Sequence, residues 1–359
     1  MTRTEFNKKA RQLVVFVFFI ILIFWLSYLW GTGAIETAAE SKMKAFTLIL
    51  WSILLEALPF VLLGTLISSL IHIYVTEATI LKILPQNNFA RLIFASCLGL
   101  IFPICECAIV PITRSLVKKG MPVGTAIAFM IATPIVNPIV LFSTYNAFPS
   151  NPEMVIYRGV FGFIAAITIG FLAGKLSDKS VLRDNDHVKE CGCTHEHHEA
   201  EACGCGCGGD AIGAGKPKKA KDVIREIISH TSREIQTVGA YLIFGAIIAA
   251  AMQIFVPKDA LVAIGTGRFS STFVMMGLAF VLSLCSEADA FIASTFMLRF
   301  SAASVLTFLI TGPMIDIKNT LMLLGSFKKR FVIKLIIIIL TVCFALGILA
   351  SFFMGGANA

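Results

Sequence analysis

Nine long runs of apolar residues determine most of what this chain can fold into. Hydrophobic residues make up 57% of its 359 residues and charged residues only 14%, far from the composition of soluble domains. A helix of about 20 residues crosses the roughly 30 Å hydrocarbon core of a bilayer, and most of the runs reach this length. We therefore expect an all-α integral membrane protein, multi-pass and located in the inner (cytoplasmic) membrane. The runs begin near Val14, Phe46, Leu92, Val123, Ile156, Val238, Thr272, Ser304 and Val332.

Thiols and carboxylates interrupt two of these runs. The segment Cys105–Cys107 reads Cys-Glu-Cys, and Cys285–Asp289 reads Cys-Ser-Glu-Ala-Asp. A carboxylate at the bilayer centre costs about 2.5–3.5 kcal/mol on insertion scales, so such residues usually line a path for a substrate or an ion. We expect the two segments to form a functional site.

The two halves of the chain resemble each other, residues 54–145 aligning with residues 234–325. Internal duplication is typical of secondary transporters, whose substrate site lies near the membrane midplane between the repeats. The sequence therefore predicts a polytopic helical transporter built from two repeated halves. The aligned pairs are Gly64 with Gly245, Cys105 with Cys285, Pro134 with Pro313, and Asn137 with Asp316.

Basic residues suggest how the halves are oriented, because lysine and arginine gather in cytoplasmic loops. If every run crossed the membrane, the basic N-terminus and the lysine-rich loop after Gly174 would lie on opposite sides. The conflict disappears if residues 91–118 and 271–299 are re-entrant hairpins, since about 13 helical residues reach roughly 20 Å into the membrane. We therefore predict an inverted pair of repeats, each with three crossings and one broken or re-entrant segment that carries cysteine and acidic residues.

Prolines mark further breaks in the helices. Pro134 and Pro138 surround Asn137, and Pro313 precedes Asp316. Backbone that leaves a helix at membrane depth must be buried in protein or line a wet cavity. We expect Asn137 and Asp316 to face the site, as gating groups or as supports for its ligands.

The stretch between the halves is rich in metal-binding side chains. Cysteines alternate there with glycines and flank a group of histidines, and thiolates combined with imidazoles suit Zn(II) or Cu(I). The glycine content and the lack of apolar periodicity predict no independent fold without metal. We interpret the stretch as an arm that acquires or senses metal. Its candidate ligands are Cys191, Cys193, His195, His197, His198, Cys203, Cys205 and Cys207.

These features divide the chain into four parts. The first run lacks the small-residue cleavage site of a signal peptide, so it is expected to remain as a helix. The basic amphipathic segment after the metal-binding stretch is expected to lie on the cytoplasmic membrane surface. The parts are residues 1–45 (N-terminal tail and first transmembrane helix), 46–175 (first membrane repeat), 176–233 (cytoplasmic Cys/His-rich loop and basic segment) and 234–359 (second membrane repeat).

Four motifs carry a resemblance to a known family. FPICECAIVPITRSLVKKGMP, TPIVNP, LCSEADAF and TGPMIDIKN, within about Leu50 to Gly347, resemble the YraQ-like bacterial predicted-permease family, which includes organoarsenical efflux permeases. The Cys/His-rich loop resembles that of the family's copper/zinc efflux branch. The arsenical permeases carry a CSC-like motif, whereas Glu106 separates the two thiols here. A mixed set of thiols and carboxylates also accepts Zn(II).

Together, the residues and the resemblance imply a permease rather than an enzyme, which exports Zn or Cu through a midplane site. We expect no tightly bound cofactor beyond a transported or loop-bound ion. No Walker A motif appears, so ATP hydrolysis by this chain is not expected. The residues expected to bind the substrate or couple protons are Cys105, Glu106, Cys107, Asn137, Cys285, Glu287, Asp289 and Asp316.

Other functions stay open at this point. Within the permease class, the substrate could be an organoarsenical or another small thiol-reactive compound. A membrane thiol oxidoreductase could use Cys105, Cys107 and Cys285, although CxC spacing fits that chemistry less well than CxxC. A metal sensor could use the membrane part as an anchor. The expected partners are the lipid bilayer, the metal ion, a cytoplasmic metallochaperone and a second copy of the chain in a homodimer; the net charge of +8 is explained by loops beside the membrane and needs no nucleic acid.

Overall fold

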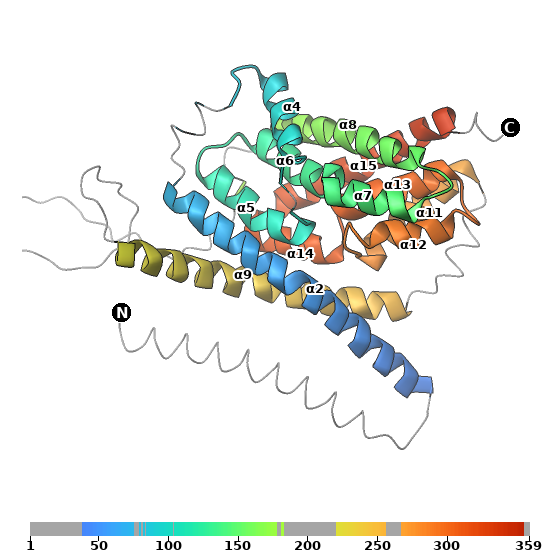
Figure 1. Ribbon diagram of the computed structural model, residues 1–359, viewed down its shortest axis with the longest axis horizontal. Coiled ribbons are helices and arrows are strands. Elements are labelled where there is room, and N and C mark those ends of the chain that lie inside the picture. Colours follow the sequence, from blue (N-terminus) through green and yellow to red (C-terminus); the bar gives the residue numbers. More distant parts are fainter. Residues whose placement is uncertain are drawn as a thin grey trace, which may run out of the picture.

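The computed structural model is a bundle of α-helices (Figure 1). It describes residues 38–74, 79, 82, 84–102, 104–177, 181–182, 220–255 and 267–354. Within these residues the β-structure consists of one bridge between Leu182 and Phe327. The helices are α2 (Ala38–Tyr74), α4 (Asn88–Leu98), α5 (Glu106–Lys118), α6 (Val123–Val136), α7 (Pro138–Ala147), α8 (Glu153–Leu176), α9 (Ala220–Phe255), α11 (Arg268–Leu282), α12 (Asp289–Phe296), α13 (Ala302–Met314), α14 (Ile317–Ser326) and α15 (Lys329–Met354).

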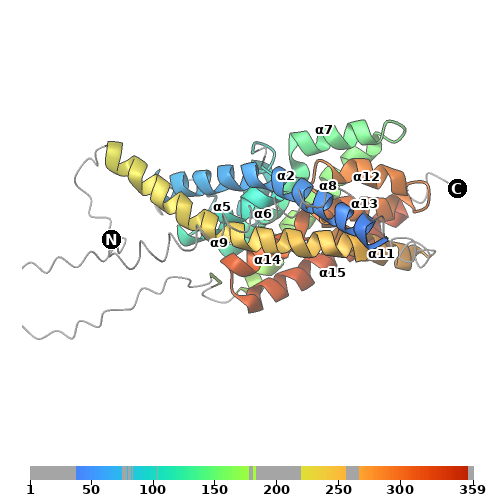
Figure 2. The same ribbon diagram turned by 90° about the horizontal axis from the view of Figure 1, so that it is seen from below.

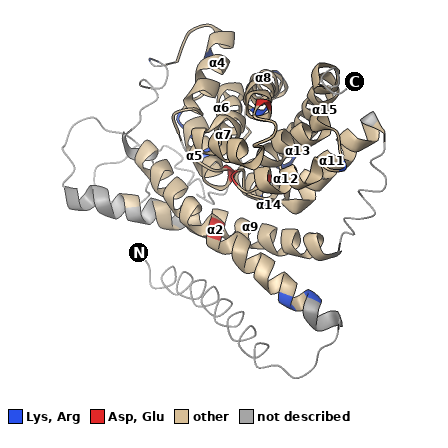
Figure 3. Cartoon of the chain, turned by 45° about the vertical axis from the view of Figure 1, so that its right-hand side comes forward, with Lys and Arg blue, Asp and Glu red and all other residues tan. Residues whose placement is uncertain are grey.

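Eight of the nine apolar runs coincide with helices, namely α2, α4, α6, α8, α9, α11, α13 and α15. The run near Val14 lies outside the described residues. Four helical stretches are long and apolar enough to cross a membrane: Lys42–Ile71, Val123–Ala147, Glu153–Leu176 and Lys329–Met354. Charged residues are sparse on these helices (Figure 3). The prediction of a polytopic, all-α membrane protein is confirmed.

Both cysteine motifs lie where a helix breaks. The chain leaves α4 at Leu98 and begins α5 at Glu106, and it leaves α11 at Leu282 and begins α12 at Asp289. Each motif therefore lies at a break between two short helices, which agrees with the predicted broken or re-entrant segments. We call the two turns, residues 99–105 and 283–288 with the first residue of the helix that follows, the hairpin tips.

Equivalent helices of the two halves run in opposite directions. The start of α6 packs at Gly124 against Gly170 and Gly174, near the end of α8. The start of α15 lies at this same end, because Lys334 Nζ donates to Leu176 O at 3.4 Å.

The second half enters from the other end of the bundle. Gly347, late in α15, packs against Thr307 of α13 and Thr272 of α11. Because α11 and α13 start there and α6 starts at the opposite end, the repeats are inverted. The basic residues after α5, at the end of α8 and at the start of α15 share one end, which agrees with the orientation that the charges predict.

The long helices α2 and α9 lie side by side across one face of the bundle (Figures 1 and 2). The first packs on α5 and the second on α14. Helix α9 is continuous from Ala220 to Phe255, so the basic segment predicted to lie on the membrane surface and the start of the second repeat form one helix. The boundary placed at residue 233 falls inside it.

Two glycines at equivalent positions of the repeats allow α2 to pack closely on α5 and α9 to pack closely on α14. A Cβ atom on Gly64 would lie 2.6 Å from Ala108 O, and one on Gly245 would lie 2.7 Å from Lys318 Cα. Both neighbours are backbone atoms, so the helices themselves would have to move apart. We expect Gly64→Ala and Gly245→Ala each to lower the free energy of unfolding by about 1–3 kcal/mol, measured by denaturation in mixed micelles.

The control for this prediction is Gly277→Ala. A Cβ atom there meets no heavy atom within 4 Å, and alanine favours the helix over glycine by about 1 kcal/mol. Equal stability changes at Gly277 and Gly245 would contradict the packing described here.

Candidate functional site

The two hairpin tips meet inside the bundle. Ser286 Oγ of the second tip donates to Glu106 Oε2 of the first at 3.3 Å, and both side chains are buried. Cys105 precedes the first residue of α5, and Cys107 follows one residue later, so both buried thiols flank this contact. The described cysteines are free thiols. The tips that the sequence predicts to oppose each other are therefore in contact.

Four short helices begin in this region. Asn137 caps α7, its Oδ1 accepting from Ile139 N at 2.9 Å, and Asp316 caps α14, its Oδ1 accepting from Asn319 N at 2.6 Å. Glu106 and Asp289 are the first residues of α5 and α12. A helix N-terminus carries about half a positive charge, which stabilises a nearby carboxylate. Acidic side chains thus occupy three of these N-termini, and the neutral amide of Asn137 occupies the fourth.

A buried lysine connects the first tip to α14. Lys318 Nζ lies 3.3 Å from Glu106 Oε1 and 3.4 Å from Asp316 Oδ2. Asp316 Oδ2 also accepts from Ser283 Oγ at 2.7 Å. With Ser286 on its other oxygen, Glu106 has both carboxylate oxygens engaged by the protein.

A buried arginine holds the second tip. Arg158 of α8 donates from both terminal nitrogens to the two oxygens of Asp289, each at 2.9 Å. It also donates to Thr144 Oγ1 at 2.8 Å and to Ser286 O at 3.2 Å. Because these bonds occupy both oxygens of Asp289, its expected role as a metal ligand or proton-coupling group stays a prediction that requires Arg158 to move.

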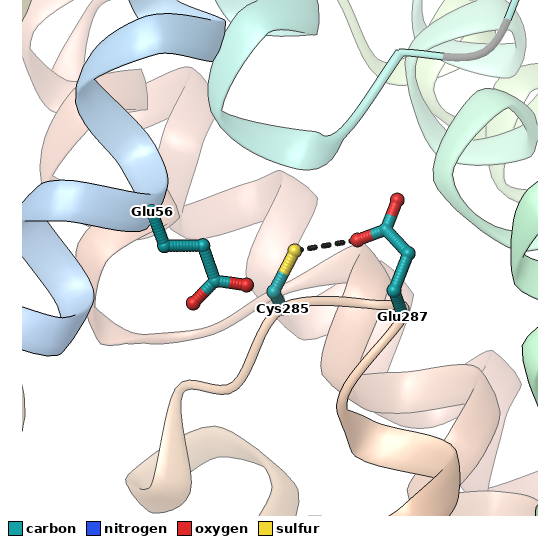
Figure 4. A group of neighbouring side chains, drawn as sticks. All are labelled: Glu56, Cys285 and Glu287. Carbon is teal, nitrogen blue, oxygen red and sulfur yellow. Dashed lines mark hydrogen bonds between the residues drawn. The ribbon is translucent and has the colours of Figure 1, made fainter.

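Two side chains of the second tip and one of α2 form a group that could hold a metal ion. The carboxylates of Glu56 and Glu287 and the thiol of Cys285 place their ligand atoms within 4.8 Å of one another. Cys285 Sγ donates to Glu287 Oε2 at 2.7 Å, and Glu56 points toward Cys285 from α2 (Figure 4). One thiol and two carboxylates suit Zn(II). We call Glu56, Cys285 and Glu287 the outer trio.

The members of the outer trio differ in exposure. Glu56 is exposed, Glu287 is half-buried and Cys285 is buried. Ser286, which follows Cys285 in the chain, contacts Glu106. The trio therefore lies between the surface and the buried carboxylate of the first tip.

Sequence reasoning found part of this site and missed three charged residues. Cys285 and Glu287 belong to the predicted set, whereas Glu56, Arg158 and Lys318 do not. Glu56 and Arg158 are lone charges within apolar stretches, and Lys318 lies two residues after Asp316. The cost of inserting a charge into the membrane, which pointed to Glu106, applies equally to all three. The cysteine motifs were predicted to form the site because they occur in both halves of the chain. The three missed charges have no counterpart of the same type in the other half, so the repeat did not point to them.

Of the remaining predicted residues, the structure places Asn137 and Asp316 but not those of the Cys/His-rich stretch. The Cys/His-rich residues 191–207 lie outside the described residues, and their predicted metal binding stays a prediction. Asn137 and Asp316 cap half-helices in the interior and are both buried. Asp316 is linked to Glu106 through Lys318, which places it nearer the contact between the tips than the sequence could show.

Inverted repeats, opposed hairpins and buried charged tips together define a helical membrane permease. The comparison with known families agrees and is more specific. The chain belongs to the family described as "Predicted permease", whose model matches residues 42–352. The YraQ-like family predicted from the motifs is thereby confirmed, while membership of the copper/zinc branch stays a prediction.

Related proteins support this assignment over most of the chain. UPF0718 protein YcgR of Bacillus subtilis (strain 168) is 45% identical over 307 residues, which cover 86% of this chain and 97% of YcgR. A "putative two-component membrane permease complex subunit" of Streptococcus mutans is 39% identical over 320 residues, covering 88% and 99% of the two chains. UPF0718 protein YraQ of Escherichia coli is 25% identical over 113 residues, 32% of each chain. No solved structure matches the chain.

Proposed function

We propose that this permease exports a soft or borderline transition metal ion, Zn(II) or Cu(I), across the inner membrane. The outer trio is the observation that supports it most directly, because it combines a thiol with two carboxylates beside the meeting point of the hairpin tips. Carboxylates alone would suit harder ions such as Mg(II) or Ca(II), whereas a thiol favours Zn(II) or Cu(I).

In the proposed route, the ion first meets the outer trio and then the buried carboxylate of Glu106 on the first tip. Glu56 is the exposed member of the site, so the proposed route begins at the trio. Cys105 and Cys107 flank Glu106 on the next tip and supply further thiols along the same path. A thiol must lose its proton to bind a metal, so the arrival of the ion at Cys285 releases a proton, which the hydrogen bond to Glu287 can pass on to water.

The Cys/His-rich residues 191–207 are expected to supply the permease with metal. The Cys/His-rich stretch collects metal ions on the cytoplasmic side and delivers them, directly or from a metallochaperone, to the membrane part. The Streptococcus mutans relative is named as a subunit of a two-component permease complex, so we also expect a second membrane subunit to accompany this chain.

Metal flux through proteoliposomes tests the proposal. We expect the intact protein to move Zn(II) or Cu(I) and Glu106→Gln to reduce the rate at least tenfold, because the variant removes the negative charge at the contact between the tips. Lys118→Gln is the matched control, since Lys118 is exposed at the end of α5. If the protein moved an organoarsenical but neither metal, the substrate would be an organoarsenical and the proposed metal cargo would be wrong.

Deleting residues 191–207 separates transport from sensing. A permease keeps its metal flux at saturating metal, and only its apparent affinity falls because the collecting arm is lost. A sensor anchored by its membrane part loses all activity with these ligands. The flux at saturating metal, compared between the deletion and the intact chain, decides between the two functions.

A further inference from the structure

Each hairpin tip is paired with a base from the other half of the chain. Glu106, in the first half, pairs with Lys318 of α14, and Asp289, in the second half, pairs with Arg158 of α8. All four side chains are buried. The two ion pairs therefore both join the repeats, and their geometries can be compared directly.

The pair made by Arg158 is built to stay closed. Its two terminal nitrogens contact both oxygens of Asp289 at 2.9 Å, and further bonds reach Thr144 and Ser286. A bidentate fork of this kind gains both energy and fixed geometry. Separating the pair would leave several buried groups without partners at once.

The pair made by Lys318 is built differently. Its ammonium lies 3.3 Å from one oxygen of Glu106 and 3.4 Å from one oxygen of Asp316, and neither contact is bidentate. An ammonium is a compact point charge on a flexible stem. If it leaves Glu106, it can stay paired with Asp316, which keeps its position through the cap of α14 and the bond from Ser283.

A metal ion that binds Glu106 meets a carboxylate that already has a cation beside one of its oxygens. Lys318 holds Oε1 and Ser286 holds Oε2. Because like charges repel strongly in a low-dielectric interior, a metal ion that reaches Glu106 from the outer trio binds most favourably when the ammonium withdraws from Oε1. The first half has no equivalent pair of charged residues, because Asn137 and Ile139 occupy the positions that match Asp316 and Lys318.

We infer that Lys318 is an internal substitute for the cargo cation, which neutralises Glu106 while the site is empty and keeps only its contact with Asp316 when the metal ion binds. The inference rests on the proposed transport of a metal cation. An internal competitor lowers the apparent affinity for the cargo by the fraction of time that it occupies the site. It also keeps the empty permease free of an unpaired buried carboxylate, which would be strongly unfavourable.

The test measures KM and kcat for Zn(II) efflux, and in parallel for Cu(I) efflux, with the full chain in proteoliposomes. We expect Lys318→Gln to lower KM at least tenfold, because the competitor is gone, and to lower kcat at least tenfold, because the empty site is no longer neutralised. A lysine that only held helices together would give weaker binding or loss of folded protein. Lys118→Gln should leave both constants unchanged.

A second variant distinguishes loss of the competing cation from misfolding of Lys318→Gln. Asp316→Asn combined with Lys318→Gln removes one charge of each sign, and asparagine is as good a helix cap as aspartate, so α14 keeps its start. This double variant should show the same lowered KM. An unchanged or raised KM in both variants refutes the role of Lys318 alone, whereas absence of saturable flux in the intact chain refutes both the metal cargo and this role.

Discussion

Arg158→Ala lowers the free energy of unfolding by about 3–5 kcal/mol, which is the usual loss when one partner of a buried ion pair is removed. The side chain of Arg158 is fully buried and engages both oxygens of Asp289. Without it, Asp289 is a buried charge with no base beside it, and Thr144 and Ser286 lose a donor. Denaturation of the purified protein in mixed micelles measures the change.

Two variants show whether the unpaired charge is the cause. Arg158→Met combined with Asp289→Leu removes both charges, and replacing a buried pair by apolar residues is often neutral, so most of the stability should return. Arg299→Ala is the matched control, because Arg299 is exposed just after α12. A double variant as unstable as Arg158→Ala would mean that the packing of the side chain, and not its charge, holds the second tip.

Cys285→Ser, Glu287→Gln and Glu56→Gln each raise the KM for metal efflux at least tenfold, if the outer trio is the first binding site of the cargo. A tenfold loss corresponds to about 1.4 kcal/mol of binding free energy. The ligand atoms lie within 4.8 Å of one another, so one ion can contact all three and each substitution removes one contact. Glu153→Gln, at the exposed start of α8, is the control and should behave as the intact chain.

Combining the substitutions tests whether the trio acts as one site. Residues that bind the same ion are coupled, so their effects should not add. We expect Cys285→Ser with Glu287→Gln to raise KM by less than the product of the two single effects. Fully additive changes would indicate that Cys285 and Glu287 act on the ion at separate places.

The helices were predictable because membrane burial leaves the backbone few alternatives. In lipid every backbone polar group must bond within its own segment, so apolar runs such as those from Val123 and Val332 become helices. The breaks near Asn137 and Asp316 were predictable too, since proline and a capping side chain together end one helix and start another. The continuity of α9 was not predicted, because a basic segment on the membrane surface and the first turns of a membrane helix have similar sequence patterns.

The site was predictable only in part. The sequence pointed to Cys285 and Glu287 because the motif repeats, and to Glu106 because an acid between two thiols is rare in an apolar run. It could not show that Lys318 reaches Glu106, 212 positions away, or that Glu56 on α2 approaches Cys285. Those contacts depend on how the two inverted halves dock against each other, and nothing in the local sequence specifies that docking.

By itself, the sequence determined that the chain is a multi-pass helical membrane protein with two repeated halves and two polar tips. It did so because apolar length and the cost of buried charge are local properties that can be evaluated residue by residue. Only the tertiary structure decided which base neutralises which acid, since a charge in the membrane can be satisfied by any partner that folding brings near. In the folded chain, Arg158 makes a bidentate contact with Asp289, whereas Lys318 contacts a single oxygen of Glu106.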